Sequence, residues 1–376
     1  MTGRSGSVPL AIALTVDDRL SPPAAGVSPI PFPWRSPSMI RRLSLMLAAA
    51  LLGLVLTGCN GPVVVVYTSV DQPFAEPVLA SFTAATGIAV RPLFDTEAAK
   101  TVGLVSRLRA EAANPQGDVF WNSEFANTVR LAREGLFEAW PPPAASDVPA
   151  LFRDPDGYWT AIGARARVLL VNTTLVATAD HPLGLDDLAS PRWPAGQVAV
   201  SQPLAGTGLT QAAAFRAAGG EAGMLAFYTR LQGAGVQFLD GNATVRDRVA
   251  AGAMQVCLTD SDDALVALAR GAPVRMILPD QGPAGSGTLL IPNTVALVKN
   301  APHPAEARRL VEYLVSAETE RMLARGESRQ IPVRPALQAE CGWLPEGGIK
   351  GYDLPLAAIA EALPSATAEL KGIFLK

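Results

Sequence analysis

The stretch Val63-Val-Val-Val-Tyr67 sets the fold class, because an unbroken β-branched run predicts a strand that is covered on both faces. A helix over 74–85, stopped by Gly87, and a strand over 88–93 follow it. The alternation continues with a helix over 97–112, a strand over 117–121 and a helix over 124–134 that Ser123 can cap. Alternating strands and helices predict an α/β unit with a parallel sheet and right-handed crossovers.

A second α/β unit follows a break in this alternation. Residues 158–163 and 166–172 predict two strands with no helix between them. The strand–helix alternation resumes over 197–278, and a strand over 289–299, interrupted at Pro292, predicts a return of the chain into the first unit. We therefore expect two lobes, formed by 62–164 with 290–328 and by 168–285 with 330–376.

Residues 39–58 have the three parts of a secretory signal. Arg41 and Arg42 precede an apolar run that is too short for a membrane span of about 20 residues. The run ends in Leu56-Thr57-Gly58-Cys59, which resembles the bacterial lipobox. That resemblance implies lipidation of Cys59 and an exported protein anchored by lipid in the bacterial cell envelope, in the periplasm or at the cell surface. The alternative is a buried helix with a chance cysteine.

The segment upstream of this signal, residues 1–38, is rich in Pro, Ser and Gly. A signal peptide normally begins the chain, so we interpret 1–38 as a non-native extension and Met39 as the true start. We expect the extension to be disordered, because nothing in it offsets the entropy of ordering.

The composition excludes several classes of function. From Cys59 onward, 26 basic residues stand against 32 acidic ones without a basic stripe, which argues against a nucleic-acid partner. No nucleophile elbow, P-loop or zinc-protease motif occurs, and His181 and His303 lie in loop-like contexts, so we expect no enzyme. Cys257 and Cys341 allow either a disulfide or buried free thiols.

The stretch Ser201-Gln-Pro-Leu-Ala-Gly206-Thr207-Gly208 lies between a predicted strand and a predicted helix. Glycines there let the backbone approach a ligand, and helix N-terminal amides favour an anion. A dinucleotide motif is incomplete, because Gln211 occupies the position of its third glycine. Two interpretations remain, namely an anion pocket or a tight turn in which Thr207 caps the helix.

Carboxylates are concentrated in Thr259-Asp260-Ser261-Asp262-Asp263, directly before a predicted helix. One Asp suffices to cap a helix, and three carboxylates repel one another unless a positive charge joins them. Asp71 and Glu124 also follow predicted strands, and ligands of open parallel sheets bind at the carboxyl ends of strands. The cluster is therefore either an oxygen-rich site for a hard cation or an amine, or plain helix capping.

Several segments together resemble bacterial extracellular solute-binding proteins of ABC importers, in particular their ferric-iron-binding branch. The resemblance spans about 63–335 and is carried by Val66-Tyr-Thr-Ser with Asp71, Asp118-Val-Phe-Trp-Asn-Ser-Glu124, Gly206-Thr207-Gly208, Asn242-Ala-Thr-Val-Arg-Asp and Ile291-Pro-Asn-Thr-Val-Ala-Leu-Val. It implies the two-lobed periplasmic-binding-protein fold (type II), an α/β fold. Each lobe would be a mainly parallel sheet flanked by helices, with the ligand cleft between the lobes. We expect a monomer that needs separate permease and ATPase subunits.

The resemblance also implies a ligand set. Positions that hold a synergistic anion in the family match four residues here: Gly206, Thr207, Gly208 and Asn242. The oxygen donors expected to hold the solute are Asp71, Glu124, Asp262 and Asp263. Glu124 matches a family carboxylate, whereas Asp71 stands in place of a histidine and Asp262-Asp263 in place of a tyrosine pair. Ferric iron with a small anion is the first expected solute.

Other solutes and other classes of protein remain as alternatives. An organic solute such as a phosphonate, a phosphorylated sugar or a polyamine would suit a site without the tyrosine pair. A secreted hydrolase would consume its ligand, and a scaffold or adhesin would show no thermal shift with any solute.

Overall fold

The computed structural model describes residues 61–95 and 102–375, which belong to the compact unit Asn60–Lys376. The expected extension over 1–38, the signal over 39–58 and the lipidation site Cys59 lie outside the described residues. Over the described ranges, none of the helices is both long and apolar enough to span a bilayer.

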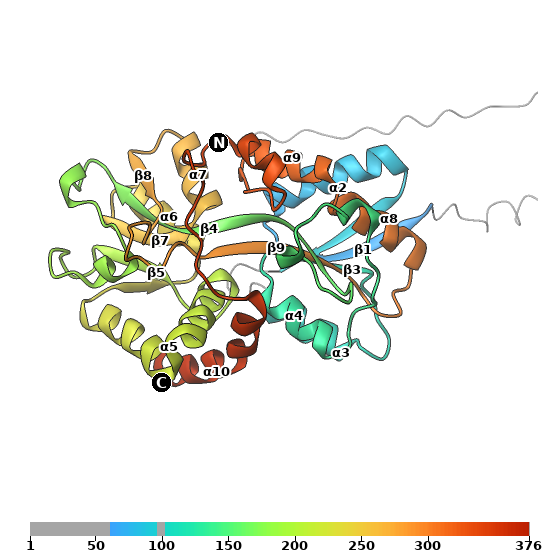
Figure 1. Cartoon of the computed structure of the whole chain (residues 1–376), viewed down its shortest axis with the longest axis horizontal. Coiled ribbons are helices and arrows are strands. Elements are labelled where there is room, and N and C mark those ends of the chain that lie inside the picture. The colour runs from blue at the N-terminus through green and yellow to red at the C-terminus, as the bar shows by residue number, and fades with distance from the viewer. Residues whose placement is uncertain (1–60, 96–101, 376) are drawn as a thin grey trace, which may run out of the picture. The chain divides into compact units, whose positions relative to one another are not determined.

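The first half of this unit alternates strands and helices as the sequence predicts (Figure 1). Its elements are β1 (Val63–Thr68), α2 (Gln72–Thr86), β2 (Ala89–Phe94), α3 (Val102–Ala110), β3 (Val119–Asn122), α4 (Ala126–Arg133) and β4 (Thr160–Asn172). Gly87 ends α2 in the left-handed conformation, with φ of 70°, which confirms the predicted stop. Short 3-10 helices at Pro143–Ala145 and Ala150–Phe152 occupy the connection before β4.

The strands of the second half join the same sheet as those of the first half. Its elements are β5 (Val198–Ser201), α5 (Gly206–Gly233), β6 (Gln237–Leu239), α6 (Asn242–Ala250), β7 (Val256–Asp260), α7 (Ser261–Ala269), β8 (Val274–Ile277), β9 (Leu290–Leu297), α8 (Pro304–Leu314), α9 (Ala317–Arg325) and α10 (Leu356–Phe374). Gly220 interrupts α5 with non-helical angles, so α5 consists of two helical segments. The last helix, α10, packs against α5.

Within the described residues, the strands form one sheet in the order β2-β1-β3-β9-β4-β7-β5-β6, and β8 also pairs with β4. The pairs β1–β2, β1–β3, β5–β6 and β5–β7 are parallel. Every pair that involves β4 or β9 is antiparallel. Figure 1 shows β4 and β9 running between the two groups of parallel strands. The sheet is therefore mixed, with antiparallel pairs in its middle and parallel pairs towards both sides.

The strand β4 connects the two groups. The sequence predicts two separate strands here, but the chain forms one strand of 13 residues that are all buried. The prediction failed because Gly163 looks like a strand breaker; it has φ of 57° and sits at a register shift, so it bends the strand without ending it. Pro292, the expected interruption of β9, lies opposite Ala164 beside the same shift and does not end β9 either.

The two alternatives for the cysteines are resolved by the fold. Cys257 lies on β7 and Cys341 at the end of the 3-10 helix Pro335–Cys341, and both are buried free thiols. Burial raises the pKa of both thiols, so each behaves as a small apolar side chain and not as a nucleophile.

Candidate functional site

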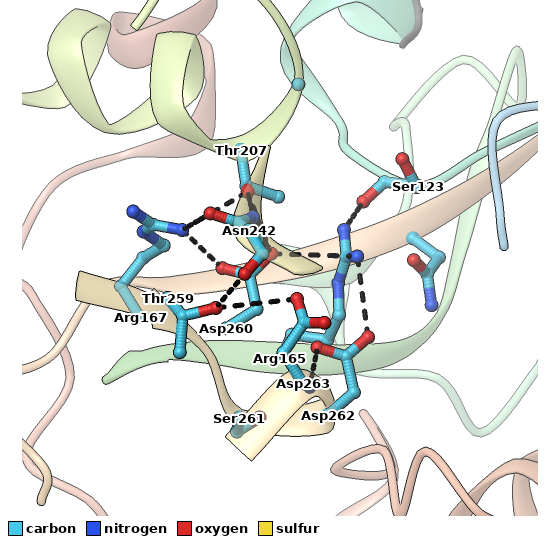
Figure 2. A network of polar contacts seen from close by, with 12 residues as sticks. Ser123, Arg165, Arg167, Thr207, Asn242, Thr259, Asp260, Ser261, Asp262 and Asp263 are labelled. Carbon is cyan, nitrogen blue, oxygen red and sulfur yellow. Dashed lines mark hydrogen bonds and ion pairs between the residues drawn. The ribbon is translucent and has the colours of Figure 1, made fainter. Parts of the chain in front are cut away.

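A polar cluster forms where the carboxyl end of β7 meets β4 and the starts of α5 and α6 (Figure 2). β4 runs antiparallel to β7, and this register sets Arg167 opposite Asp260. β5 runs parallel to β7, so the loop that follows β5 begins at the same edge as Asp260. The topology thus brings a strand arginine, a strand-end carboxylate and two helix starts together.

The pair Arg167 and Asp260 forms the centre of this cluster. Their closest contact joins Arg167 Nη1 to Asp260 Oδ1 at 2.7 Å, and both side chains are at least 98% buried. Thr207 Oγ1 and Asn242 Nδ2 donate to Asp260 Oδ2 at 2.8 and 2.9 Å. Arg167 Nε donates to Gln211 Oε1 at 2.8 Å. Every charged atom named here has a partner, which is what a buried ion pair requires.

Arg165 lies two residues before Arg167 on β4 and joins a second carboxylate. Its Nη1 is 3.5 Å from Asp262 Oδ2 and 3.7 Å from Asp260 Oδ2, and its Nη2 donates to the carbonyl of Ser123. Burial works against the charge on Arg165, but Asp262 and Asp260 outweigh it and raise the pKa of the guanidinium. Burial likewise opposes the charge on Asp260, and Arg167 and Arg165 outweigh it, so the pKa of Asp260 is lowered.

For Asp263, burial and a neighbouring negative charge outweigh the arginine with which it pairs. Arg246 Nη1 contacts Asp263 Oδ1 at 2.7 Å, and the backbone N–H of Asp263 donates to Asp262 Oδ1 at 3.0 Å. Burial and then the charge of Asp262 raise the pKa of Asp263 well above its ordinary value, and Arg246 offsets them only in part. Oxygens of Asp260, Asp262 and Asp263 all lie within 4.8 Å of one another, which is close enough to hold a cation together.

Asp71 approaches the same cluster from the other group of strands. It precedes α2 at the N-cap position and forms no side-chain cap hydrogen bond there. A pocket of about 340 Å³ contains both Asp71 and Asp263 in its wall, together with Arg246, Arg270 and Glu327. Asp71 and Asp263 thus line one pocket, whereas Asp262 is not among the described residues of its wall.

Glu124 has a different place. Its carboxylate accepts from the backbone N–H groups of Ala126 at 2.6 Å and Asn127 at 3.1 Å, so it caps α4. The expected cap by Ser123 is wrong, because the Ser123 side chain points towards Ser69. Glu124 is not among the described residues that line the two pockets beside Asp263. It does contact the second group of elements, since Thr210 Oγ1 on α5 lies 3.2 Å from Glu124 Oε2.

The four expected anion-binding residues line one small pocket of about 50 Å³: Gly206, Thr207, Gly208 and Asn242. Thr207 is not the helix cap, because Ala205 is the N-cap residue and α5 has no side-chain cap. The Thr207 hydroxyl and the Asn242 amide point to Asp260 and Arg167 instead of into open space (Figure 2). The loop therefore offers a ligand its backbone and not these two side chains.

Sequence reasoning missed the three arginines that neutralise the carboxylates: Arg165, Arg167 and Arg246. The signal was present in Ala164-Arg-Ala-Arg-Val, since two charges at alternate positions of an otherwise apolar strand point to the same face. Arginines in a strand that is buried on both faces need buried partners, and the carboxylates after β7 supply them.

Comparisons with known proteins show what this chain is similar to. The family described as bacterial extracellular solute-binding protein matches residues 118–342. Iron uptake protein A1 of Synechocystis sp. is 27% identical over 317 residues, covering 80% of this chain and 84% of the relative. A putative 2-aminoethylphosphonate-binding periplasmic protein of Salmonella typhi is 26% identical over 252 residues, covering 66% of this chain and 71% of the relative.

Solved structures extend the likeness to the whole fold. The crystal structure of iron-bound HitA from Pseudomonas aeruginosa superposes with a TM-score of 0.74 at 24% identity, over 84% of this chain and all of that one. This likeness confirms the two-lobed α/β fold of periplasmic binding proteins that the sequence resemblance implies. Since the family match covers more than half of the sequence, the chain belongs to the bacterial extracellular solute-binding proteins.

Proposed function

We propose that this chain is the exported solute-capturing component of an ABC importer, working as a monomer that binds its solute without turnover. It would deliver the solute to a permease and an ATPase carried by other chains. Family membership supports this role. The structure adds a polar site where the carboxyl ends of strands meet, which is where ligands of open α/β sheets bind.

The capture step would be closure of two lobes, 62–164 with 290–328 and 168–285 with 330–376. The contacts of Ser123 with Arg165 and of Glu124 with Thr210 join elements of the two groups of strands beside the pockets. Closure on a solute should make the molecule more compact. Small-angle scattering with and without saturating solute measures this, and an unchanged radius of gyration would contradict the hinge.

The proposed solute is ferric iron, held with a small anion. The observation that carries this proposal is the trio Asp260, Asp262 and Asp263, whose oxygens lie within 4.8 Å of one another beside the pocket that Asp71 also lines. Carboxylate oxygens are suitable ligands for hard cations. The name of the Synechocystis relative points in the same direction. Asp71, Glu124, Asp262 and Asp263 remain the proposed ligands, although Glu124 would have to leave its helix cap.

A specific observation favours a second solute class, an organic molecule with an ammonium group and an anionic group. Arg165, Arg167 and Arg246 already balance the charges of the three carboxylates, so a trivalent cation would find no net negative charge on this trio. A zwitterion such as an aminophosphonate would leave that balance unchanged. The Salmonella relative carries the name of such a solute.

A thermal-shift titration separates the two classes. Ferric nitrilotriacetate should raise the melting temperature, by the equivalent of about 2.7 kcal/mol at a hundredfold excess over Kd, and 2-aminoethylphosphonate should not. Asp262→Ala with Asp263→Ala should abolish the iron effect. The matched control is Asp180→Ala with Asp186→Ala, two exposed carboxylates outside the pockets. Iron stabilisation that survives the Asp262 and Asp263 changes would show that the cluster only supports α7.

Anchoring at Cys59 is a separate part of the proposal. Changing Cys59→Ala should move the protein from the membrane fraction to the soluble fraction, or leave it as an uncut precursor. One acyl chain holds a protein only marginally at a membrane, so stable anchoring requires that Cys59 carry more than one chain. Unaltered membrane fractionation of Cys59→Ala would contradict lipid anchoring without affecting the binding proposal.

A further inference from the structure

The bend of β4 at Gly163 is held by a buried carboxylate that comes from α9. Gly163 has no paired residue among the described residues of β9, because the register shifts there. Its backbone N–H donates to Glu320 Oε1 at 3.2 Å, and Glu320 is 1% exposed. The same oxygen accepts the backbone N–H of Val333 at 2.8 Å. One buried oxygen therefore joins β4 to the chain segment that follows α9.

Arg334 gives this carboxylate its counter-charge. Arg334 Nη1 lies 2.9 Å from Glu320 Oε2, and both side chains are almost completely buried. Arg334 Nη2 also donates to the carbonyls of Ala144 at 2.6 Å and Val315 at 3.0 Å. Its Nε donates to Asp147 Oδ1 at 2.8 Å. Both members of the ion pair thus have the further hydrogen bonds that a buried pair needs to hold one geometry.

Three connections between the two groups of strands meet at this point. In the proposed division into lobes, the chain crosses within β4, at the start of β9 and within 328–334. Ala164 on β4 exchanges two backbone hydrogen bonds with Ile331, at 2.7 and 2.8 Å. Gln330 Oε1 accepts from Asn293 Nδ2 on β9 at 2.5 Å. A rotation of the lobes must change backbone angles in these connections, so the bonds that join them limit the rotation.

Gly163 is the place where β4 can take up such a change. It lies at the bulge, and its φ of 57° is one that a residue with a side chain rarely adopts. A Cβ placed on Gly163 would lie 2.7 Å from Gln330 Oε1. The Gln330 side chain therefore forms a wall against one side of the bend, while Glu320 holds its backbone N–H.

We propose that Glu320, Arg334 and Gln330 form a latch that sets the resting angle between the two lobes. The proposal rests on the proposed lobe closure, and it identifies the side chains that control it. The latch fixes both β4 and the segment 328–334 to α9, so β4 keeps a single bend and the solute-free molecule populates a narrow range of interlobe angles. Without the latch, the backbone of Gly163 can change its angles, and this range widens.

The distance between two spin labels, one on each lobe, tests the latch in the solute-free protein. Ala84→Cys on α2 and Ala269→Cys on α7 give two exposed labelling sites. Cys257 and Cys341 are buried, and Cys59 is changed to Ala, so the labels react at the two chosen sites. Double electron–electron resonance then measures the distribution of distances between the lobes.

Glu320→Gln keeps the shape of the side chain, but its one acceptor oxygen cannot serve both backbone N–H groups and Arg334 together. The distance distribution should therefore broaden beyond that of wild type. Glu318→Gln, the same change on a side chain of α9 that is 67% exposed, is the matched control and should leave the distribution unchanged. Gln330→Ala removes the wall without uncovering a buried charge, so it should broaden the distribution even if Glu320→Gln does not fold. A wild-type distribution for Gln330→Ala, or for folded Glu320→Gln, overturns the proposal.

Failure of the proposed function gives a different result from failure of the latch. Suppose that ferric nitrilotriacetate or 2-aminoethylphosphonate shortens the distance between the labels in wild type, but the latch variants leave the solute-free distribution unchanged. The latch is then wrong and lobe closure stands. Broadening in the latch variants, without a shorter distance in wild type on addition of either solute, supports the latch and removes the proposed solutes.

Discussion

Changing Asp260→Asn keeps the shape of the side chain and removes the charge on which the buried arginines depend. Asp260 accepts from Arg167, Thr207 and Asn242 at 2.7 to 2.9 Å, and it lies 3.7 Å from Arg165. The amide of Asn puts either a donor or a neutral oxygen in front of Arg167. A guanidinium that is almost completely buried then loses its counter-charge and cannot regain water.

The cost follows from the burial of both partners. Removing one partner of a buried ion pair destabilises a protein by about 3–5 kcal/mol, because the other charge stays buried. In a chain of this size, 1 kcal/mol shifts the melting temperature by about 2 °C, so we expect a loss of roughly 8 °C. Asp186→Asn, on an ion pair whose carboxylate is 79% exposed, should change stability by less than about 0.5 kcal/mol.

Differential scanning calorimetry of the solute-free protein is the assay. Arg167→Met should be destabilising alone, and the double variant with Asp260→Asn should lose less than the sum of both, because the two charges act together. A melting temperature for Asp260→Asn no lower than that of Asp186→Asn would refute the argument. So would strict additivity of the two changes.

Two further predictions concern stability. Asp118 is fully buried and accepts the backbone N–H groups of Val65 and His303, each at 2.7 Å. Asp118→Ala should therefore lower the free energy of unfolding by about 3 kcal/mol, and Asp118→Asn, which keeps one acceptor oxygen, should lower it clearly less. Chemical unfolding that ranks the two variants equally would contradict this. Because the folded state raises the pKa of Asp263, the folded protein binds its proton more tightly than the unfolded chain does, and solute-free stability falls as pH rises from about 4 through that raised pKa. The melting temperature of Asp263→Asn should therefore rise relative to that of wild type as pH increases. A difference between the two melting temperatures that does not change with pH would exclude Asp263 as the cause.

Most of the fold could be predicted because its signals are local. The β-branched run at Val63, the helix stop at Gly87 and the strand–helix alternation each depend on neighbouring residues, and the structure confirms them. The strand β4 could not be predicted, because its continuity depends on partners far away in the chain. Gly163 keeps its strand position only because β9 pairs on both sides of the bulge.

The positions of the carboxylates and the glycine loop could be predicted from the sequence, but the arginines that balance their charge could not. The carboxylates after β7 and the glycine loop after β5 lie together, as strand topology predicts. Their partners Arg165 and Arg167 belong to β4, which is antiparallel to β7, so no motif along the sequence connects them. The cap that Glu124 forms on α4 was missed for a similar reason, since one turn of α4 decides which carboxylate reaches the first helix amides.

The course of β4 limits how this protein can be divided. Its residues Thr160–Ala166 pair with β9, and Arg167–Asn172 pair with β7 and β8. A cut anywhere along β4 would remove an interior strand from one group of elements and expose unpaired backbone on both fragments. Neither fragment would be soluble alone, and the two would have to be expressed together to reassemble. Engineers who want new chain ends should place them in surface connections and leave this strand whole.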